Sequence, residues 1–189
     1  MSASTRWIRK LLSIFLLVLV GVGYIFPSHT LAASPQVTFP ANDFVITVKT
    51  DNPGITSNTE FEIPTSTGET YNYNVDCNDD GTDEATAQSG DYTCTYASPG
   101  TYAIRISDNS GAGTGFPRIY FNNPFPGLFG HVSDSEKLLT VIQWGNGQWE
   151  SMNMAFAGCT YMTIADTNAP DLSNVTDMEG MFYQAEAMN

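Results

Sequence analysis

The 189-residue sequence has few residues of the kinds that bind metals or act as nucleophiles. It contains two histidines and three cysteines, and no two cysteines lie at the spacing of a zinc site. It also lacks the G-x-S-x-G, H-E-x-x-H and phosphate-binding glycine motifs. These absences exclude the enzyme classes that such motifs mark. A catalytic pair of carboxylates stays open, because that pair is defined by its separation in space.

Basic residues are also scarce. The chain has 7 basic and 20 acidic residues, a net charge of −13. Residues 1–33 hold three of the basic groups and no acidic one, so the remainder has 4 basic and 20 acidic residues and a net charge of −16. Such a surface repels nucleic acid and anionic lipid, and we expect neither as a partner. Aromatic residues make up 12% of the chain, which argues against a disordered acidic tail.

The N-terminus has the pattern of a secretion signal. Three basic residues within the first ten are followed by an apolar run over residues 11–26 and by the small residues Ala32 and Ala33. A bilayer-spanning helix needs about 20 apolar residues, so this run is short for one. We therefore predict a signal peptide over residues 1–33 and a secreted or cell-surface protein. An uncleaved N-terminal anchor is the alternative, and no other membrane segment is expected.

Residues 34–110 have the texture of an antiparallel β-sandwich. Apolar residues alternate with polar ones in several short runs, and turn residues such as those in Asp51-Asn52-Pro53-Gly54 separate the runs. Five short strands at intervals of roughly ten residues are typical of this fold. The predicted strands are 44–49, 60–63, 71–77, 92–96 and 102–106.

Two of the cysteines are placed for a disulfide. Cys77 and Cys94 lie in phase with the apolar side of their predicted strands, and 17 positions separate them, which suits a hairpin. An exported protein meets oxidising conditions, so we predict a Cys77–Cys94 disulfide. Cys159 is then a free, buried thiol. Two unpaired core cysteines at positions 77 and 94 are the alternative.

The segment between those cysteines resembles the first half of a calcium loop. Asp76, Asn78 and Asp80 place oxygen ligands at alternate positions, and a glycine follows them. The bidentate glutamate of a complete loop is missing, because Ala87 stands at the twelfth position. A weak calcium site is one interpretation, and an Asx-rich hairpin turn is the other. We expect no other cofactor.

Residues 149–162 and 175–188 are the same unit written twice, 26 positions apart. Met152 and Phe156 of the first unit correspond to Met178 and Phe182 of the second. In the second unit, a possible capping box predicts a helix from position 176, with Met178, Met181 and Phe182 on one face. We expect Met152, Phe156, Met178, Met181 and Phe182 to be buried in one core, because repeated units bury their apolar faces against their neighbours.

The domain organisation follows from these patterns. After the sandwich we expect a connecting segment over residues 111–136 with buried aromatics, and then a repeat region over residues 137–189. The first strand of that region is predicted at 137–144. The second unit stops at position 189, before it could close, so we expect the repeat array to be truncated.

These residues resemble a known family. The run Ser173-Asn174-Val175-Thr176-Asp177-Met178-Glu179-Gly180-Met181-Phe182 is similar to the repeat of BspA-like leucine-rich-repeat surface proteins. Thr95-Tyr96-x-x-Pro99-Gly100-Thr101-Tyr102 resembles the closing strands of PKD-like domains. The resemblance implies a mixed fold: an N-terminal antiparallel β-sandwich followed by the start of an α/β leucine-rich-repeat-like solenoid.

The resemblance also implies a function. We expect an adhesin-like, non-enzymatic protein in which the sandwich is a spacer or cap and the repeats bind a protein or glycan ligand at the cell surface. The alternative is an accessory carbohydrate-binding region of a secreted polysaccharide-degrading enzyme. Exposed aromatic residues on one sandwich face, such as Tyr71 and Tyr73, would favour that alternative.

Overall fold

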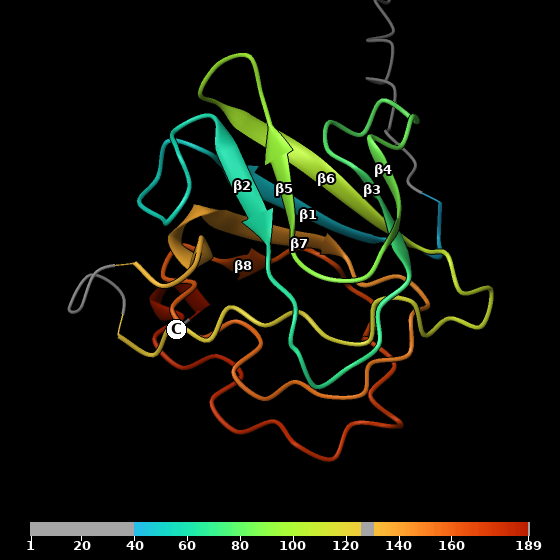
Figure 1. The fold of residues 1–189 in the computed structure, drawn as a ribbon. Coiled ribbons are helices and arrows are strands. Elements are labelled where there is room, and N and C mark those ends of the chain that lie inside the picture. The colour runs from blue at the N-terminus through green and yellow to red at the C-terminus, as the bar shows by residue number, and fades with distance from the viewer. Residues whose placement is uncertain (1–39, 126–130, 189) are drawn as a thin grey trace, which may run out of the picture. The chain divides into compact units, whose positions relative to one another are not determined.

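Two β-sheets build the part of the chain that the computed structural model describes, residues 40–125 and 131–188 (Figure 1). These residues belong to one compact unit, Thr38–Asn189. The predicted signal peptide, residues 1–33, lies outside the described residues. Within them, no helix has the length and apolar character needed to cross a bilayer.

The larger sheet has six strands and is antiparallel except at one edge. Its central strand β1 (Phe44–Lys49) has the sequence Phe-Val-Ile-Thr-Val-Lys, a β-branched run that favours extended backbone, and four of its six residues are fully or almost fully buried. In spatial order the strands are β4 (Ala85–Gln88), β3 (Tyr73–Asp76), β6 (Thr101–Asp108), β1 (Phe44–Lys49), β7 (Leu138–Gln143) and β8 (Thr163–Ile164).

The smaller sheet is the antiparallel pair β2 (Glu60–Ile63) and β5 (Tyr92–Thr95). In β2, buried and partly exposed residues alternate, so Phe61 and Ile63 face the core. Both belong to the same buried cluster as residues of the larger sheet, and Figure 1 shows β2 and β5 in front of that sheet. Of the predicted mixed fold, the antiparallel β-structure is confirmed at this coarse level.

The sandwich and the repeat region share a sheet and a core. Strand β7, predicted as the first strand of the repeats, pairs antiparallel with β1, and β8 then adds to β7 in parallel. In the connecting segment Phe116 and Phe121 are buried, as predicted for its aromatics, whereas Phe125 is 47% exposed and corrects that prediction in part. The described parts of the segments 34–110 and 137–189 therefore pack together. The predicted boundary marks a change in local structure within one compact unit.

The predicted helix from Thr176 is not formed. Residues 179–184 are a run of turns, and the only helical elements in the described chain are two short 3₁₀ turns, η1 (Ser135–Lys137) and η2 (Glu186–Met188). Gly180 and Gln184 have positive φ angles of 64° and 62°, a left-handed backbone that an α-helix cannot contain. This region therefore has no helical face, and the expectation of an α/β unit is corrected to turns and short strands.

Candidate functional site

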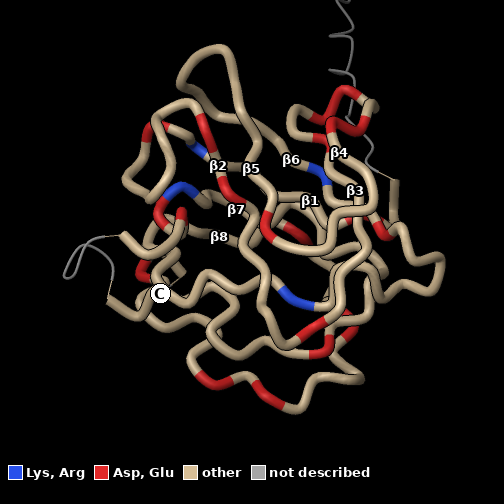
Figure 2. The backbone as a smooth tube through the Cα atoms, viewed as in Figure 1, with Lys and Arg blue, Asp and Glu red and all other residues tan. Residues whose placement is uncertain are grey.

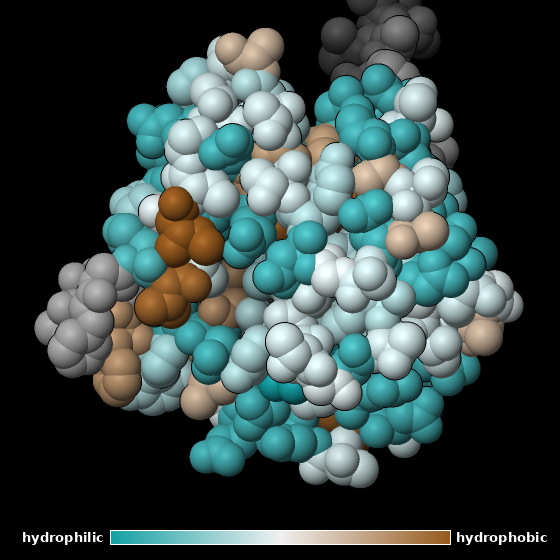
Figure 3. Space-filling model, viewed as in Figure 1, coloured by the Kyte–Doolittle hydropathy of each residue, from teal (hydrophilic) through white to brown (hydrophobic). Residues whose placement is uncertain are grey.

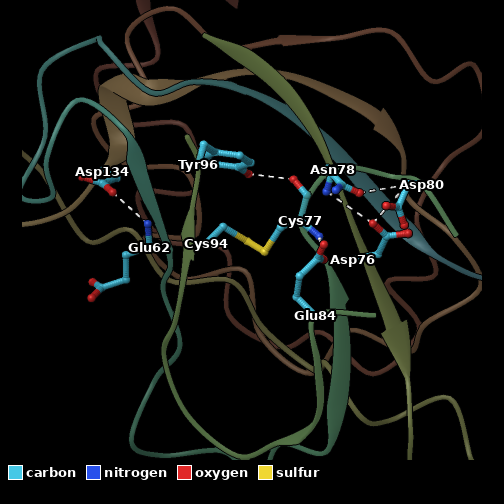
Figure 4. Close-up of a disulfide and its surroundings, with 9 residues drawn as sticks. All are labelled: Glu62, Asp76, Cys77, Asn78, Asp80, Glu84, Cys94, Tyr96 and Asp134. Atoms are coloured by element: carbon cyan, nitrogen blue, oxygen red, sulfur yellow. Dashed lines mark hydrogen bonds between the residues drawn. A yellow bond between two sulfur atoms is a disulfide. The ribbon is translucent and has the colours of Figure 1, made fainter. Parts of the chain in front are cut away.

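The predicted disulfide is present and joins the two sheets. Cys77 follows β3 of the larger sheet, Cys94 lies in β5 of the smaller one, and their Cα atoms are 5.7 Å apart (Figure 4). Cys94 is fully buried and Cys77 nearly so. The Tyr96 hydroxyl donates a hydrogen bond to the Cys77 carbonyl at 2.7 Å. Cys159 is free and buried, and burial raises the pKa of its thiol well above the usual value, so it is protected from reaction.

The predicted calcium ligands form a hydrogen-bonded turn. The Asp76 carboxylate accepts hydrogen bonds from the backbone N–H groups of Asn78, Asp80 and Gly81, and the Asn78 side chain accepts a second one from Asp80 (Figure 4). Asp76 also pairs with the guanidinium of Arg105. Among the described residues no group of three or more acidic, histidine or cysteine side chains could hold a metal ion. The interpretation as an Asx-rich turn accounts for this loop.

Arg105 forms ion pairs with three carboxylates next to that turn. It pairs with Asp76, with Asp43 at 3.4 Å and with Asp79 at 3.3 Å. Burial alone would raise the pKa of Asp76, but the hydrogen bonds from Arg105 and from backbone N–H groups outweigh it and lower that pKa. Burial does raise the pKa of Asp43 and of Asp79, because one guanidinium cannot compensate all three charges. The cluster fixes the start of β1 against the turn after β3.

A second buried ion pair, Asp134 with Lys137, was not predicted. Both side chains are completely buried, and their charged atoms lie 3.6 Å apart. Burial lowers the pKa of Lys137 against the opposing effect of Asp134. The pair ties η1 to the loop before β2 and to β2 itself through hydrogen bonds to Ile55, Thr56, Ser57, Glu60 and Glu62. A lysine directly before an apolar strand is usually solvated, so its sequence context carries no signal for this role.

The two repeat units share a pattern of turn hydrogen bonds. In the first unit, the N–H of Ala155 donates to the carbonyl of Met152, and 26 positions later Met181 donates to Met178. Three further turn bonds recur with the same offset. They are Ala157 to Met154 with Tyr183 to Gly180, Cys159 to Phe156 with Ala185 to Phe182, and Met162 to Cys159 with Met188 to Ala185. Positive φ angles recur at the same offset, at Met154 with Gly180 and at Gly158 with Gln184.

A parallel ladder of hydrogen bonds joins the two units. The N–H groups of alternate residues from 152 to 158 each donate to the residue that precedes the donor's own counterpart in the second unit, which is the slanted pattern of parallel pairing at an offset of 26. The bonds run from Met152 to Asp177, Met154 to Glu179, Phe156 to Met181 and Gly158 to Tyr183, at 2.8–2.9 Å. In Figure 1 the orange and red segments accordingly run next to each other below the sheets.

The connecting segment closes the other side of the first unit. Phe121 and Asn123 donate their backbone N–H groups to the carbonyls of Ala155 and Ala157, both at 3.2 Å. Arg118 donates to the carbonyl of Asn153 at 2.8 Å. The first unit is therefore covered on both sides, by residues 118–123 and by the second unit.

Burial of the predicted repeat core follows from this arrangement. Met152 and Phe156 of the first unit are completely buried, and Met181 is 7% exposed. Met178 is 49% exposed and Phe182 is 37% exposed, so the prediction that both are buried is wrong. Their counterparts are covered by the second unit, whereas nothing in the described chain covers Met178 and Phe182 in turn. The ring of Phe182 stacks on that of Phe156 with centroids 5.7 Å apart.

Charge is distributed unevenly over the fold. Each of the four basic residues in the described chain pairs with a carboxylate: Lys49 with Asp51, Arg105 with Asp76, Arg118 with Glu69 and Lys137 with Asp134. From position 138 onward the sequence has six acidic residues and no lysine or arginine. Figure 2 shows acidic residues along the lower loops of this C-terminal region. The repeat units therefore present a negative surface.

Strongly hydrophobic side chains are few on the viewed face. Figure 3 shows hydrophilic residues over most of that face, with strongly hydrophobic atoms in one small cluster. Of the large hydrophobic side chains that are exposed among the described residues, half belong to the second unit. They are Ile55, Phe125, Val132, Tyr161, Met178, Phe182, Tyr183 and Met188. The second unit is thus the strongest candidate for an interaction surface.

Comparison with known proteins adds no relative: no family model, curated protein or solved structure matches the chain.

Proposed function

We propose that this chain is an exported, non-enzymatic interaction protein. In this proposal a PKD-like β-sandwich is the cap of a BspA-like solenoid, and the stacked units present the binding surface to a protein or glycan at the cell surface. The parallel ladder between the two units is the observation that carries it. Units that bond head to tail with a constant offset extend a surface without needing a separate core.

The carbohydrate-binding alternative has less support. It calls for aromatic rings exposed on a sandwich face, where sugars can stack on them. Tyr71 is only 4% exposed, Tyr73 is completely buried, and each hydroxyl bonds to a backbone carbonyl. Burial raises the pKa of Tyr71 to about 12 and raises that of Tyr73 further. These rings belong to the core and offer no sugar platform.

Binding of the exported protein to immobilised extracellular proteins and to a glycan array tests the proposal. We expect saturable binding to at least one ligand class. The double variant Tyr161→Asp, Tyr183→Asp should weaken it by roughly tenfold or more, because both exposed rings belong to the repeat units and would act as anchor residues of the interface. Ile55→Asp is the matched control, because Ile55 is similarly exposed, at 45%, but lies outside the repeat units.

Two results would contradict the proposal. One is the absence of binding across both panels, and the other is binding that the double variant leaves unchanged. Export is tested separately by N-terminal sequencing of secreted material, which should begin at Ala33 or Ser34. A membrane-bound form that retains residues 1–26 would refute cleavage.

A further inference from the structure

The outward edge of the second unit is a row of unused hydrogen-bond donors. The N–H groups of Met178, Gly180, Phe182 and Gln184 are the counterparts of the four that join the first unit to the second. Within residues 40–125 and 131–188 these four groups have no hydrogen-bond partner. The carbonyls of Met178, Gly180 and Phe182 are already occupied by turn bonds inside the unit. The edge therefore offers donors and no matching row of acceptors.

Each unit consequently has two unlike edges. The edge of the second unit that faces the first supplies the carbonyls of Asp177, Glu179, Met181 and Tyr183, and its opposite edge supplies N–H groups. Two copies related by a two-fold axis would place donors against donors, so the edge cannot pair with itself. Head-to-tail addition of a second copy is also blocked, because residues 118–123 already occupy the acceptor edge of its first unit.

The charge and the exposed side chains of this edge limit which kinds of molecule can bind to it. Donor edges also attract anions, but the six acidic residues after position 138, with no basic residue among them, disfavour an anionic ligand. Neutral backbone carbonyls are the acceptors that remain. The apolar Met178 and Phe182, half and about one-third exposed, require apolar surface on the occupant.

We propose that this edge binds a further polypeptide unit of the same 26-residue pattern, added in parallel with its acceptor edge inward. Its carbonyls at the positions equivalent to Asp177, Glu179, Met181 and Tyr183 accept the four free N–H groups. Its apolar residues cover Met178 and Phe182 as those two cover the first unit. This inference rests on the proposed function, in which the units stack, and it specifies the partner's chemistry and register.

A chain extended by one unit tests this inference. A copy of residues 164–188 joined directly after Asn189 preserves the 26-residue spacing, and tethering supplies a high effective concentration. Amide hydrogen exchange is followed by NMR in the full chain with this extension. The control carries the same 25 residues in scrambled order.

We expect exchange at Met178, Gly180, Phe182 and Gln184 to slow by about tenfold or more in the extended chain and to stay fast in the scrambled control. The amides of residues 152–158, already bonded, should be protected in both and report that the fold is intact. Unchanged exchange at the four positions with an intact fold would overturn the inference. Equal protection by the scrambled extension would overturn it as well.

A second copy as the occupant gives a different signature. In analytical ultracentrifugation of the unextended chain, we expect no dimer that depends on Phe182. A dimer that the Phe182→Asp variant abolishes would refute the donor-edge argument. The ligand panels described above are independent of both measurements. If ligand binding is present but the four amides are not protected, the stacking inference fails alone and the proposed function stands.

Discussion

Phe156 and Phe182 offer a matched test of how the repeat units are stabilised. They occupy the same position in two units with the same turn bonds, and their rings stack on each other. Phe156 is completely buried, whereas Phe182 is 37% exposed. Truncation of each to alanine therefore removes the same atoms from two environments. Phe156 is covered by the second unit, whereas no further unit in the described chain covers Phe182.

The expected losses differ by a factor that can be measured. Phe156 lies between the second unit and the body of the protein, with ring centroids 5.8 Å from Trp144 and 6.4 Å from Phe121. Phe156→Ala leaves a cavity among these rings and should cost about 3–5 kcal/mol of unfolding free energy. Phe182→Ala leaves a site open to water, so only the transfer of the covered part of the ring is lost, about 1–2 kcal/mol.

Equilibrium unfolding in urea at pH 7, with the disulfide intact, measures both losses. The slope of the unfolding free energy against urea should be unchanged in each variant, because the same surface is exposed on unfolding. A domain of this size has a total stability of about 5–15 kcal/mol, so the Phe156→Ala protein retains a measurable transition. Equal losses in the two variants, or a larger loss for Phe182→Ala, would refute the assignment of the second unit as an open end.

The remaining predictions concern the disulfide and the carboxylates around Arg105. Replacing Cys77 and Cys94 by serine should lower the unfolding free energy, measured in urea, by about 3 kcal/mol, because the 17-residue loop is then unconstrained in the unfolded chain. Cys159 should react with a thiol reagent only after unfolding. Asp76→Asn should cost about 3–5 kcal/mol at pH 7, since it breaks a buried ion pair. The lowered pKa of Asp76 means that this stabilisation is present above about pH 4 and is lost as the pH falls through the folded-state pKa, so the variant should lose less stability than the parent on acidification. Asp43→Asn should cost less at pH 7, because the pKa of Asp43 is raised and its charge is disfavoured in the fold; an equal cost would contradict this ordering.

The strands were predictable where side chains alternate strongly. Residues 44–49 and 60–63 form strands with the predicted bounds, because β-branched and apolar residues at period 2 suit a pleated surface with a buried face. The same phase argument placed Cys77 and Cys94 on the inner side of their strands and so predicted the disulfide. Strand β4, Ala85–Gln88, was missed because its short, mostly exposed residues carry no such pattern.

The repeat region shows why periodicity alone misled the prediction of a helix. Buried residues at positions 152, 155, 156, 159 and 162 are spaced like one face of a helix, yet they lie on a run of turns. Turns in succession return the chain to the same side every three or four residues, as a helix does. The distinguishing feature is the left-handed backbone at two positions in each unit. Glycine, which favours that conformation, stands at Gly158 and Gly180, but Met154 and Gln184 give no sequence signal for it.

The two edges of the repeat region differ in the charge that their backbone groups attract. Arg118 closes the acceptor edge of the first unit: it donates to the Asn153 carbonyl, pairs with Glu69 and lies over the ring of Tyr120 at 4.1 Å. A cation is favourable there because the acceptor edge presents carbonyl oxygens.

At the opposite edge the second unit presents N–H groups, which repel a cation and attract a carboxylate. The acidic residues Asp177 and Glu179 nevertheless direct their own backbone carbonyls into the ladder, and the Asp177 side chain accepts the Glu179 N–H, so the carboxylate does not cap the outer edge. The outer donors thus remain available to neutral carbonyls, which a chain of the same conformation presents at the matching spacing.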